Sequence, residues 1–223
     1  MQAVIFGAGK IAEVVHTHVF SDPSISIAGF TCDRAFMTGQ TFRHLPLVAF
    51  EEVEIRFPPE KFAMLVAVGY QDLNGVRAER CRQSRDKGYR LMSWMSPNAH
   101  VAPDCVIGTN CVVMDGAIVQ PGARLGDNVF VWGGAVVGHH ATVGDHCWLA
   151  SNCTISSTVA VEPSCFIGVN AAIGHGITVG ERSLIGAGAI ITHSTAPGGV
   201  YVPGDTERLR LSSERFLKIA RLV

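Results

Sequence analysis

Imidazole groups recur at a fixed spacing in the second half of this sequence, and imidazole is the side chain best suited to moving protons near neutral pH. His139, His175 and His193 belong to one series of positions 18 residues apart, in which Ser157 takes the remaining place. His139 differs from the other two because a second imidazole, His140, follows it in the segment G-H-H-A-T-V-G. We therefore interpret His139 as a candidate general base and expect His193 to be an exposed residue without a catalytic role.

A second group of residues could bind a phosphate. The turn at 7–10 (Gly-Ala-Gly-Lys) lies between a short apolar run and a helical pattern, and it begins a G-x-G-x-x-A motif. Backbone N–H groups at the start of such a helix favour an anion. A further apolar run, 25–31, ends at Asp33, whose carboxylate could accept hydrogen bonds from a ribose or a base. These features favour a nucleotide-type ligand.

The hydrophobic pattern predicts the element that positions the histidines. Between residues 99 and 194 every sixth residue is a medium-sized aliphatic one, through sixteen repeats without an insertion. A period of six suits neither a helix nor a hairpin and is typical of parallel β-helices. Three repeats close one triangular coil, so residues 18 apart should lie above one another at a spacing of about 4.8 Å. The aliphatic positions are 101, 107, 113, 119, 125, 131, 137, 143, 149, 155, 161, 167, 173, 179, 185 and 191.

Cysteines follow the same repeat. Five of the seven occupy the small-residue position two places before an aliphatic one, where a small apolar side chain points inward. We interpret them as core residues rather than zinc ligands or disulfide partners, and this use of cysteine indicates a reducing, cytoplasmic setting. The five are Cys105, Cys111, Cys147, Cys153 and Cys165.

The first part of the chain reads as a small β-α-β sheet. We expect strands at 3–6, 25–31, 62–68 and 89–94, and helices at 10–19, 47–57 and 74–87. A last helix, from Ser213 to Leu222, is expected to cover the open end of the coil. The predicted domains are 1–96, Rossmann-like; 97–205, β-helix; and 206–223, C-terminal helix.

Composition excludes several classes of partner. The 223 residues carry 18 Lys and Arg against 19 Asp and Glu, so there is no basic stripe for nucleic acid. The uncharged run 129–144 follows the six-residue repeat, which argues against a membrane-spanning helix. No cleavable leader is expected, because Met1 leads directly into a strand and a glycine-rich turn.

The G-H-H-A-T-V-G segment in its repeat, together with the glycine-rich turn, resembles the hexapeptide-repeat acyltransferases. The similarity is to the subfamily that acetylates nucleotide-linked amino sugars or sialic acid, and it extends to about Val202. The resemblance implies an α/β Rossmann-like domain that binds the nucleotide sugar, a left-handed parallel β-helix, and a homotrimer. It also implies acetyl-CoA as co-substrate and no metal.

The resemblance also implies roles for residues of the coil. His139 matches the catalytic base, and His140 stands where the family has an acidic residue that supports the base. The backbone N–H of Ser157, one coil further on, matches the oxyanion hole.

Cofactor contacts of the family fall on Trp148, which replaces a histidine, and on Val169 and Ala187. The family's closing Gly-x-Pro-Ala-Lys is replaced here by residues 202–205, Val-Pro-Gly-Asp. In the first domain Cys32 replaces one of two usual aspartates. The implied substrate-binding residues are Gly9, Lys10, Ile11, Cys32, Asp33 and Gly69.

The leading hypothesis is acetyl transfer from acetyl-CoA to the amino group of a nucleotide-linked sugar at a subunit boundary, in the synthesis of a surface polysaccharide or glycan precursor. One alternative is O-acetylation of the sialic acid type. Another is a zinc hydratase of the γ-carbonic anhydrase type, since His139 and His175 are 36 residues apart, although Gly180 stands at the third ligand position. A non-catalytic trimer that binds nucleotide sugars is the third.

Overall fold

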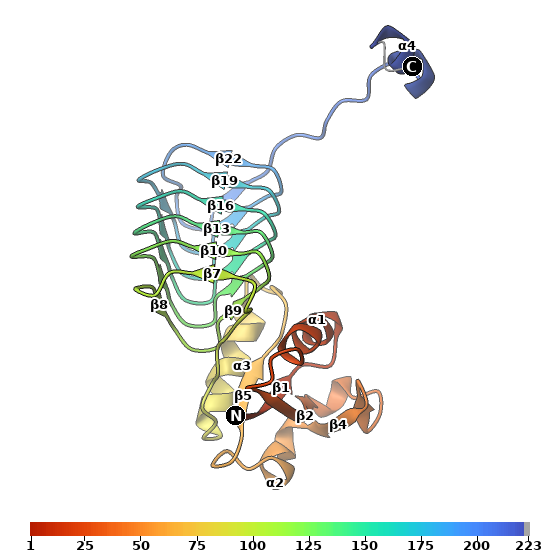
Figure 1. Cartoon of the computed structure of the whole chain (residues 1–223), viewed down its shortest axis with the longest axis vertical. Helices are drawn as coiled ribbons and strands as arrows, with labels where there is room; N and C mark the ends of the chain where they lie inside the picture. Colours follow the sequence, from red (N-terminus) through yellow and green to blue (C-terminus); the bar gives the residue numbers. More distant parts are fainter. Residues whose placement is uncertain (221–223) are drawn as a thin grey trace.

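A parallel sheet with helices on its two sides forms the first part of the chain in the computed structural model, which describes residues 1–220 (Figure 1). The strand order is β3-β4-β2-β1-β5, and only the short β3 runs antiparallel. The apolar runs pair in parallel, because their side chains are buried on both faces. The strands are β1 (Gln2–Phe6), β2 (Ser26–Cys32), β3 (Thr41–Phe42), β4 (Leu45–Ala49) and β5 (Ala63–Val66); the helices are α1 (Lys10–Val19), η1 (Arg34–Phe36), η2 (Phe50–Glu52), α2 (Val53–Arg56) and α3 (Gly75–Asp86).

Two sequence-based expectations for this part were wrong. The stretch 47–57 was predicted as one helix, but its first three residues belong to β4 and the α-helix begins only at Val53. Leu47, Val48 and Ala49 pair with β2, and this ladder replaces the first turn of the expected helix. The expected strand at 89–94 is reduced to a single bridge between Leu91 and Met64.

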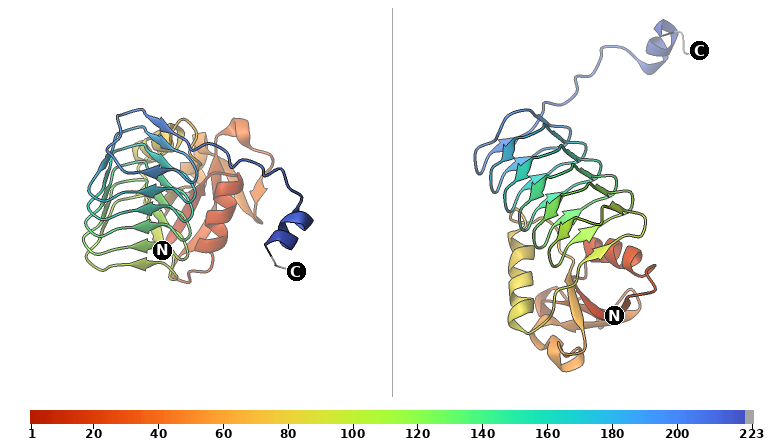
Figure 2. Two further views of the ribbon diagram at one scale, coloured as in Figure 1. Left: turned by 90° about the horizontal axis from the view of Figure 1, so that it is seen from above. Right: turned by 60° about the vertical axis from the view of Figure 1, so that its left-hand side comes forward.

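Three parallel sheets form the predicted coil above this domain (Figure 2). Every aliphatic position of the repeat ends a two-residue strand, and every strand pairs with the strand 18 residues away, as in the series Val119, Val137, Ile155, Ile173 and Ile191. The coil already includes Trp94 and Met95, which pair with Val112 and Val113. The hexapeptide β-helix predicted from the sequence is therefore confirmed.

We call the sheets first, second and third. The first sheet holds β7 (His100–Val101), β10 (Ile118–Val119), β13 (Val136–Val137), β16 (Thr154–Ile155), β19 (Ala172–Ile173) and β22 (Ile190–Ile191). The second holds β8 (Val106–Ile107), β11 (Arg124–Leu125), β14 (Thr142–Val143), β17 (Ala160–Val161) and β20 (Thr178–Val179). The third holds β6 (Trp94–Met95), β9 (Val112–Val113), β12 (Phe130–Val131), β15 (Trp148–Leu149), β18 (Phe166–Ile167), β21 (Leu184–Ile185) and β23 (Val200–Tyr201).

Each corner needs two special backbone positions. We call the corner between the first and second sheets the histidine corner; it includes residues 138–141. A Cβ added to Gly138 would lie 2.6 Å from the backbone N of Ser157 in the next coil, so only glycine fits there. One residue per coil then adopts a positive φ, and at this corner it is Gly122, His140, Thr158 or Gly176.

The aliphatic and small residues of the repeat fill the interior of the coil as one cluster. A second cluster joins the third sheet to the first domain, where Phe130 and Trp148 pack with residues of β1 and α1. Four of the five repeat cysteines are fully buried and Cys105 is partly buried, which agrees with their interpretation as core residues. All seven cysteines are free thiols.

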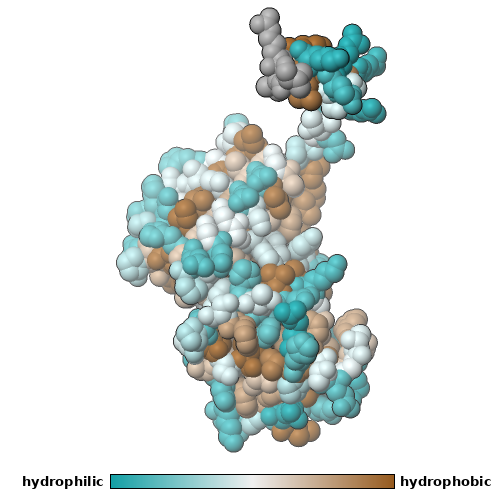
Figure 3. Space-filling view, turned by 45° about the vertical axis from the view of Figure 1, so that its right-hand side comes forward, coloured by the Kyte–Doolittle hydropathy of each residue, from teal (hydrophilic) through white to brown (hydrophobic). Residues whose placement is uncertain are grey.

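The C-terminal segment departs from expectation. After β23 the chain runs outward, and α4 (Ser213–Ile219) lies away from the coil rather than over its open end (Figures 1 and 2). Residues 202–220 are all exposed, and apolar side chains of this segment, such as Phe216, face solvent (Figure 3). The turn at Pro203 and Gly204 directs the chain off the sheet, so the expected cover is absent. The expected helix end at Leu222 lies outside the described residues.

No helix among residues 1–220 is long and apolar enough to cross a membrane.

Candidate active site

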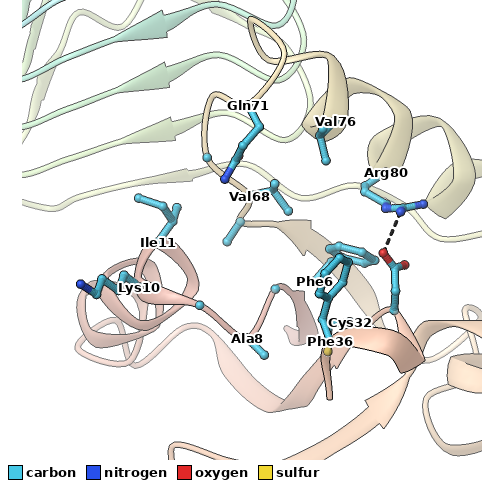
Figure 4. Close-up of a pocket in the computed structure, with 15 residues that line it drawn as sticks. Phe6, Ala8, Lys10, Ile11, Cys32, Phe36, Val68, Gln71, Val76 and Arg80 are labelled. Carbon is cyan, nitrogen blue, oxygen red and sulfur yellow. Dashed lines mark hydrogen bonds and ion pairs between the residues drawn. The ribbon is translucent and has the colours of Figure 1, made fainter. Parts of the chain in front are cut away.

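A cavity of about 730 Å³ opens at the carboxyl ends of β1, β2 and β5 (Figure 4). All six residues that the sequence suggested for substrate binding line it: Gly9, Lys10, Ile11, Cys32, Asp33 and Gly69. Parallel topology explains the convergence, since the loops after neighbouring strands meet at one edge of the sheet.

The glycine-rich turn forms one wall of this cavity. Gly7 has φ +130°, and a Cβ there would lie 2.6 Å from the carbonyl oxygen of Ala67. Glycine therefore lets the turn pass close to β5 before α1 begins. Gly9 is the residue before α1 and has open space around it, so the first N–H groups of that helix remain accessible to an anion.

Asp33 does not face the cavity as an isolated carboxylate. Arg80 of α3 donates a hydrogen bond to Asp33 Oδ2 at 2.7 Å, and both side chains are three-quarters or more buried. The cavity thus presents a carboxylate oxygen and guanidinium N–H groups side by side, a combination that can bind both the donors and the acceptors of a nucleobase or sugar.

Sequence reasoning missed Arg80 and Phe36. Phe36 follows Asp33 by three residues on η1, lines the cavity and is 72% exposed, which offers a flat surface for stacking (Figure 4). Val68 and Val76 complete the apolar lining. The exposed aromatic so soon after Asp33 is a signal that could have been noticed.

His139 and His140 lie together at the exposed histidine corner. Their Nδ1 atoms are 3.1 Å apart, so one of them donates to the other. The backbone N–H of His139 donates to Oε1 of Gln120 in the preceding coil at 2.9 Å. The ring of His140 lies where a side chain at Gly122 would be, because a Cβ there would approach His140 Cδ2 to 2.9 Å.

Ser157 is the vertical neighbour of His139, as the 18-residue spacing predicts. The N–H of Thr158 donates to the carbonyl of His139 at 3.0 Å, and the backbone N of Ser157 lies directly above Gly138. Within residues 1–220 the Ser157 N–H has no hydrogen-bond acceptor, which leaves it available to a ligand.

Val169 and Ala187 form a separate pair at the corner between the third and first sheets. The N–H of Gly188 donates to the carbonyl of Val169, and the backbone N of Ala187 lies above Gly168. Within one protomer the width of the first sheet separates this pair from His139, so the chain does not bring these residues together by itself.

Trp148 lies elsewhere. It is 4% exposed and stacks on Phe130, with their ring centroids 5.4 Å apart, inside the junction between the third sheet and the first domain. The expectation that Trp148 contacts a cofactor does not fit this position, because Phe130, Tyr70 and Arg77 occupy its surroundings. The reason is that residue 148 is on a strand of the third sheet rather than at a corner.

Arg77 of α3 holds this junction. It is fully buried, its guanidinium lies 4.7 Å from the ring centroid of Phe130, and it donates to Oδ1 of Asn128 at 2.9 Å. It also donates to the carbonyl of Gly69, which lines the cavity, and to that of His146. Burial lowers the pKa of Arg77 to about 10, so the side chain stays charged at neutral pH. The junction therefore links the cavity to the coil.

Residues 1–220 contain no group of three or more His, Cys, Asp or Glu side chains placed to hold a metal ion.

Two family models match the coil. Residues 122–157 match the bacterial transferase hexapeptide model, which describes six repeats. Residues 103–139 and 158–193 match the hexapeptide repeat of succinyl-transferase. The repeat therefore defines the class: a hexapeptide-repeat coil of the bacterial transferase type.

Solved structures that match nearly the whole chain extend this class. The acetyltransferase domain of PglB from Neisseria gonorrhoeae, in complex with acetyl coenzyme A, is 26% identical with a TM-score of 0.80; the match covers 89% of this chain and 94% of that one. PerB from Caulobacter crescentus, in complex with CoA and GDP-perosamine, is 25% identical with a TM-score of 0.80 over 90% and 93%. A histidine-to-asparagine mutant of the perosamine N-acetyltransferase from that organism, with the same two ligands, is 25% identical with a TM-score of 0.81 over 90% and 92%.

A search of curated protein sequences found no match. The structural comparisons nevertheless agree with the repeat, and the chain closely resembles hexapeptide-repeat acetyltransferases that act on nucleotide-linked amino sugars.

Proposed function

We propose that the protein is an acetyl-CoA-dependent N-acetyltransferase whose acceptor is the amino group of a nucleotide-linked sugar, a precursor of a surface polysaccharide or glycan. The observation that carries this proposal is the combination, in one chain, of the cavity behind the glycine-rich turn and the His139–Ser157 pair on the coil. Similarity to PerB, solved with CoA and GDP-perosamine, supports both halves.

In the proposed reaction the nucleotide binds in the cavity and its sugar amine reaches His139. The amine nitrogen attacks the thioester carbonyl carbon, a C–N bond forms, and the carbonyl electron pair moves to oxygen. His139 takes the proton that the amine loses. When the oxyanion collapses, the C–S bond breaks and the CoA sulfur leaves with a proton returned by His139. The Ser157 N–H donates to the oxyanion.

His140 has a defined part in this scheme. If His139 Nδ1–H donates to the unprotonated Nδ1 of His140, the Nε2 atom of His139 is left with a free electron pair. An imidazole thus does what a carboxylate does in related sites, which is to fix the tautomer of the base.

We propose a homotrimer as the working form, because Val169 and Ala187 lie across the first sheet from His139 in one protomer. A neighbouring protomer could bring its own corner to His139, so that acetyl-CoA binds between two chains. The seven free thiols support a reducing, cytoplasmic setting for this trimer.

The decisive experiment is a product assay by mass spectrometry, with acetyl-CoA and a panel of nucleotide-linked amino sugars that includes GDP-perosamine. Gain of one acetyl group on the amine is the expected result. Transfer to a hydroxyl, as on sialic acid, would support O-acetylation instead. Calorimetry that detects binding of a nucleotide sugar but none of acetyl-CoA would indicate a non-catalytic binding protein, and stoichiometric zinc would indicate a hydratase.

Replacing the base tests the assignment of His139. We expect His139→Ala to lower kcat by roughly a hundredfold or more, because the amine then loses its proton to water alone. His193→Ala is the matched control, since His193 belongs to the same corner and is exposed. Turnover in His139→Ala equal to that of the wild type would remove His139 from the mechanism.

A further inference from the structure

Above the proposed base, a second imidazole bonds to the serine of the same column. Ser157 Oγ lies 2.9 Å from Nδ1 of His175, the residue 18 positions further on. His139, Ser157 and His175 therefore occupy three successive coils at the histidine corner, with Ser157 between the two histidines. Ser157 faces the base with its backbone N, which lies above Gly138, and it bonds to His175 with its hydroxyl.

The direction of the Ser157–His175 hydrogen bond follows from Thr158. The hydroxyl of Thr158 donates to the carbonyl of Ser157 at 2.7 Å, so its only hydrogen is already used. Its oxygen also lies 3.4 Å from His175 Nδ1, where it can act only as an acceptor. Two hydroxyl oxygens thus face Nδ1, and the arrangement that satisfies both places the hydrogen on Nδ1.

This tautomer has a chemical consequence for Ser157. If His175 Nδ1–H donates to Ser157 Oγ, the hydroxyl hydrogen of Ser157 is free to point elsewhere. The free N–H and the free O–H then belong to one residue, one coil above His139, and both can reach the same small group. Two donors converging on one oxygen are the usual composition of an oxyanion hole.

We propose that the hydroxyl of Ser157 is a second oxyanion donor and that His175 is a positioning residue that orients it. The inference rests on the proposed acyl transfer and concerns the same site. When the amine attacks the thioester, the oxyanion receives hydrogen bonds from both the N–H and the O–H of Ser157. His175 contacts neither substrate and acts only through the serine.

The test is a double-mutant cycle measured with the acceptor found in the product assay. Ser157→Ala keeps the backbone N–H and removes the hydroxyl, and we expect kcat to fall by roughly a hundredfold with little change in KM for either substrate. We expect His175→Ala to lower kcat by about tenfold, since the serine hydroxyl remains but is no longer oriented.

His175→Asn is the conservative variant, because its side-chain amide can still donate to Ser157 Oγ, and it should recover most of the loss. In the Ser157→Ala background, His175→Ala should cause no further loss, because the group it orients is already absent. His193→Ala again serves as the matched control, and the unfolding temperature of each variant shows whether the coil is intact.

Three outcomes would overturn the inference. Wild-type kcat in Ser157→Ala would exclude the hydroxyl as a donor. Equal losses from His175→Ala in both backgrounds would mean that His175 acts independently of Ser157. Failure of His175→Asn to recover activity would contradict the orienting hydrogen bond. If the wild-type protein acetylates no acceptor while it binds neither substrate, it is the proposed function that fails.

Discussion

At the scale of single residues, the proposed base is supported by an imidazole instead of a carboxylate. The backbone of His140 has a positive φ of 57°, a conformation that asparagine, aspartate and glycine adopt most readily. The same turn that gives this φ brings its Nδ1 to 3.1 Å from that of His139. Supporting the base and turning the corner are therefore two demands on one position.

Variants that keep the turn separate these demands. We expect His140→Gly to lower kcat by about tenfold or more, because the tautomer of His139 is no longer fixed. His140→Asp should retain activity, since its carboxylate can accept from His139 Nδ1–H in the same backbone conformation. Steady-state kinetics at saturating acetyl-CoA measures both variants, and equal activity of His140→Gly and the wild type would rule out the supporting role.

His146 gives a residue-scale prediction for stability. Asn128 Oδ1 accepts from Arg77 and from Asn110, so the Asn128 amide nitrogen is the donor to His146 Nδ1 at 2.9 Å. This Nδ1 must then be unprotonated. Burial, with smaller contributions from Arg77 and Arg85 and opposed by Asp145, lowers the pKa of His146.

A pKa that is lower in the folded than in the unfolded state means that unfolding takes up protons. His146 therefore contributes stability that is fully present above about pH 6.5 and is lost as the pH falls through its lower folded pKa. We expect His146→Asn, which extends the asparagine series and suits the positive φ of 63° there, to reduce this loss. Urea unfolding at about pH 7.5 and about pH 5.5 measures it. His16, whose pKa burial also lowers, remains in both proteins, so the difference between them belongs to His146.

How far the sequence predicts the site depends on what sets each position. The repeat alone places Ser157 above His139, because a register of 18 residues admits no other neighbour. It does not predict the hydrogen bonds of His175 and Thr158, since those depend on side-chain rotation at an exposed corner. Trp148 was misplaced because a family position was transferred to a strand that faces the first domain.

At the scale of elements, α3 is the connection between the two parts of the chain. Its sequence is highly charged and suggests an exposed helix, yet Arg77 is fully buried. Nothing local predicts this burial, because it arises only when the third sheet covers that face of the helix. The same limitation applies to residues 47–49, which join β4 because β2 offers a partner.

Substitution of Arg77 tests this junction. Arg77→Ala leaves buried acceptors such as Asn128 Oδ1 without a donor, and each such group costs about 1–3 kcal/mol. We expect Arg77→Ala to lower the unfolding temperature clearly, and Arg77→Lys to lower it less because some donors remain. Differential scanning calorimetry measures the shift. A variant with the wild-type unfolding temperature would show that the guanidinium does not stabilise the junction.

At the scale of the whole molecule, the separation between His139 and the Val169–Ala187 pair makes the proposed site incomplete in a single protomer. The trimer predicts a solution mass of three times the 23.8 kDa protomer, measured by light scattering after size-exclusion chromatography. Activity should decrease on dilution to concentrations at which the trimer dissociates. A fully active monomer would contradict the shared site.

The unbroken register of the coil also limits how such a chain can change in length. Deleting one residue from a coil would shift every later side chain by one place and turn polar corner residues into the interior. Removing or duplicating 18 consecutive residues leaves each remaining residue above an equivalent neighbour. Length is therefore quantised in this architecture, and each permitted step lengthens the molecule by one strand spacing, about 4.8 Å.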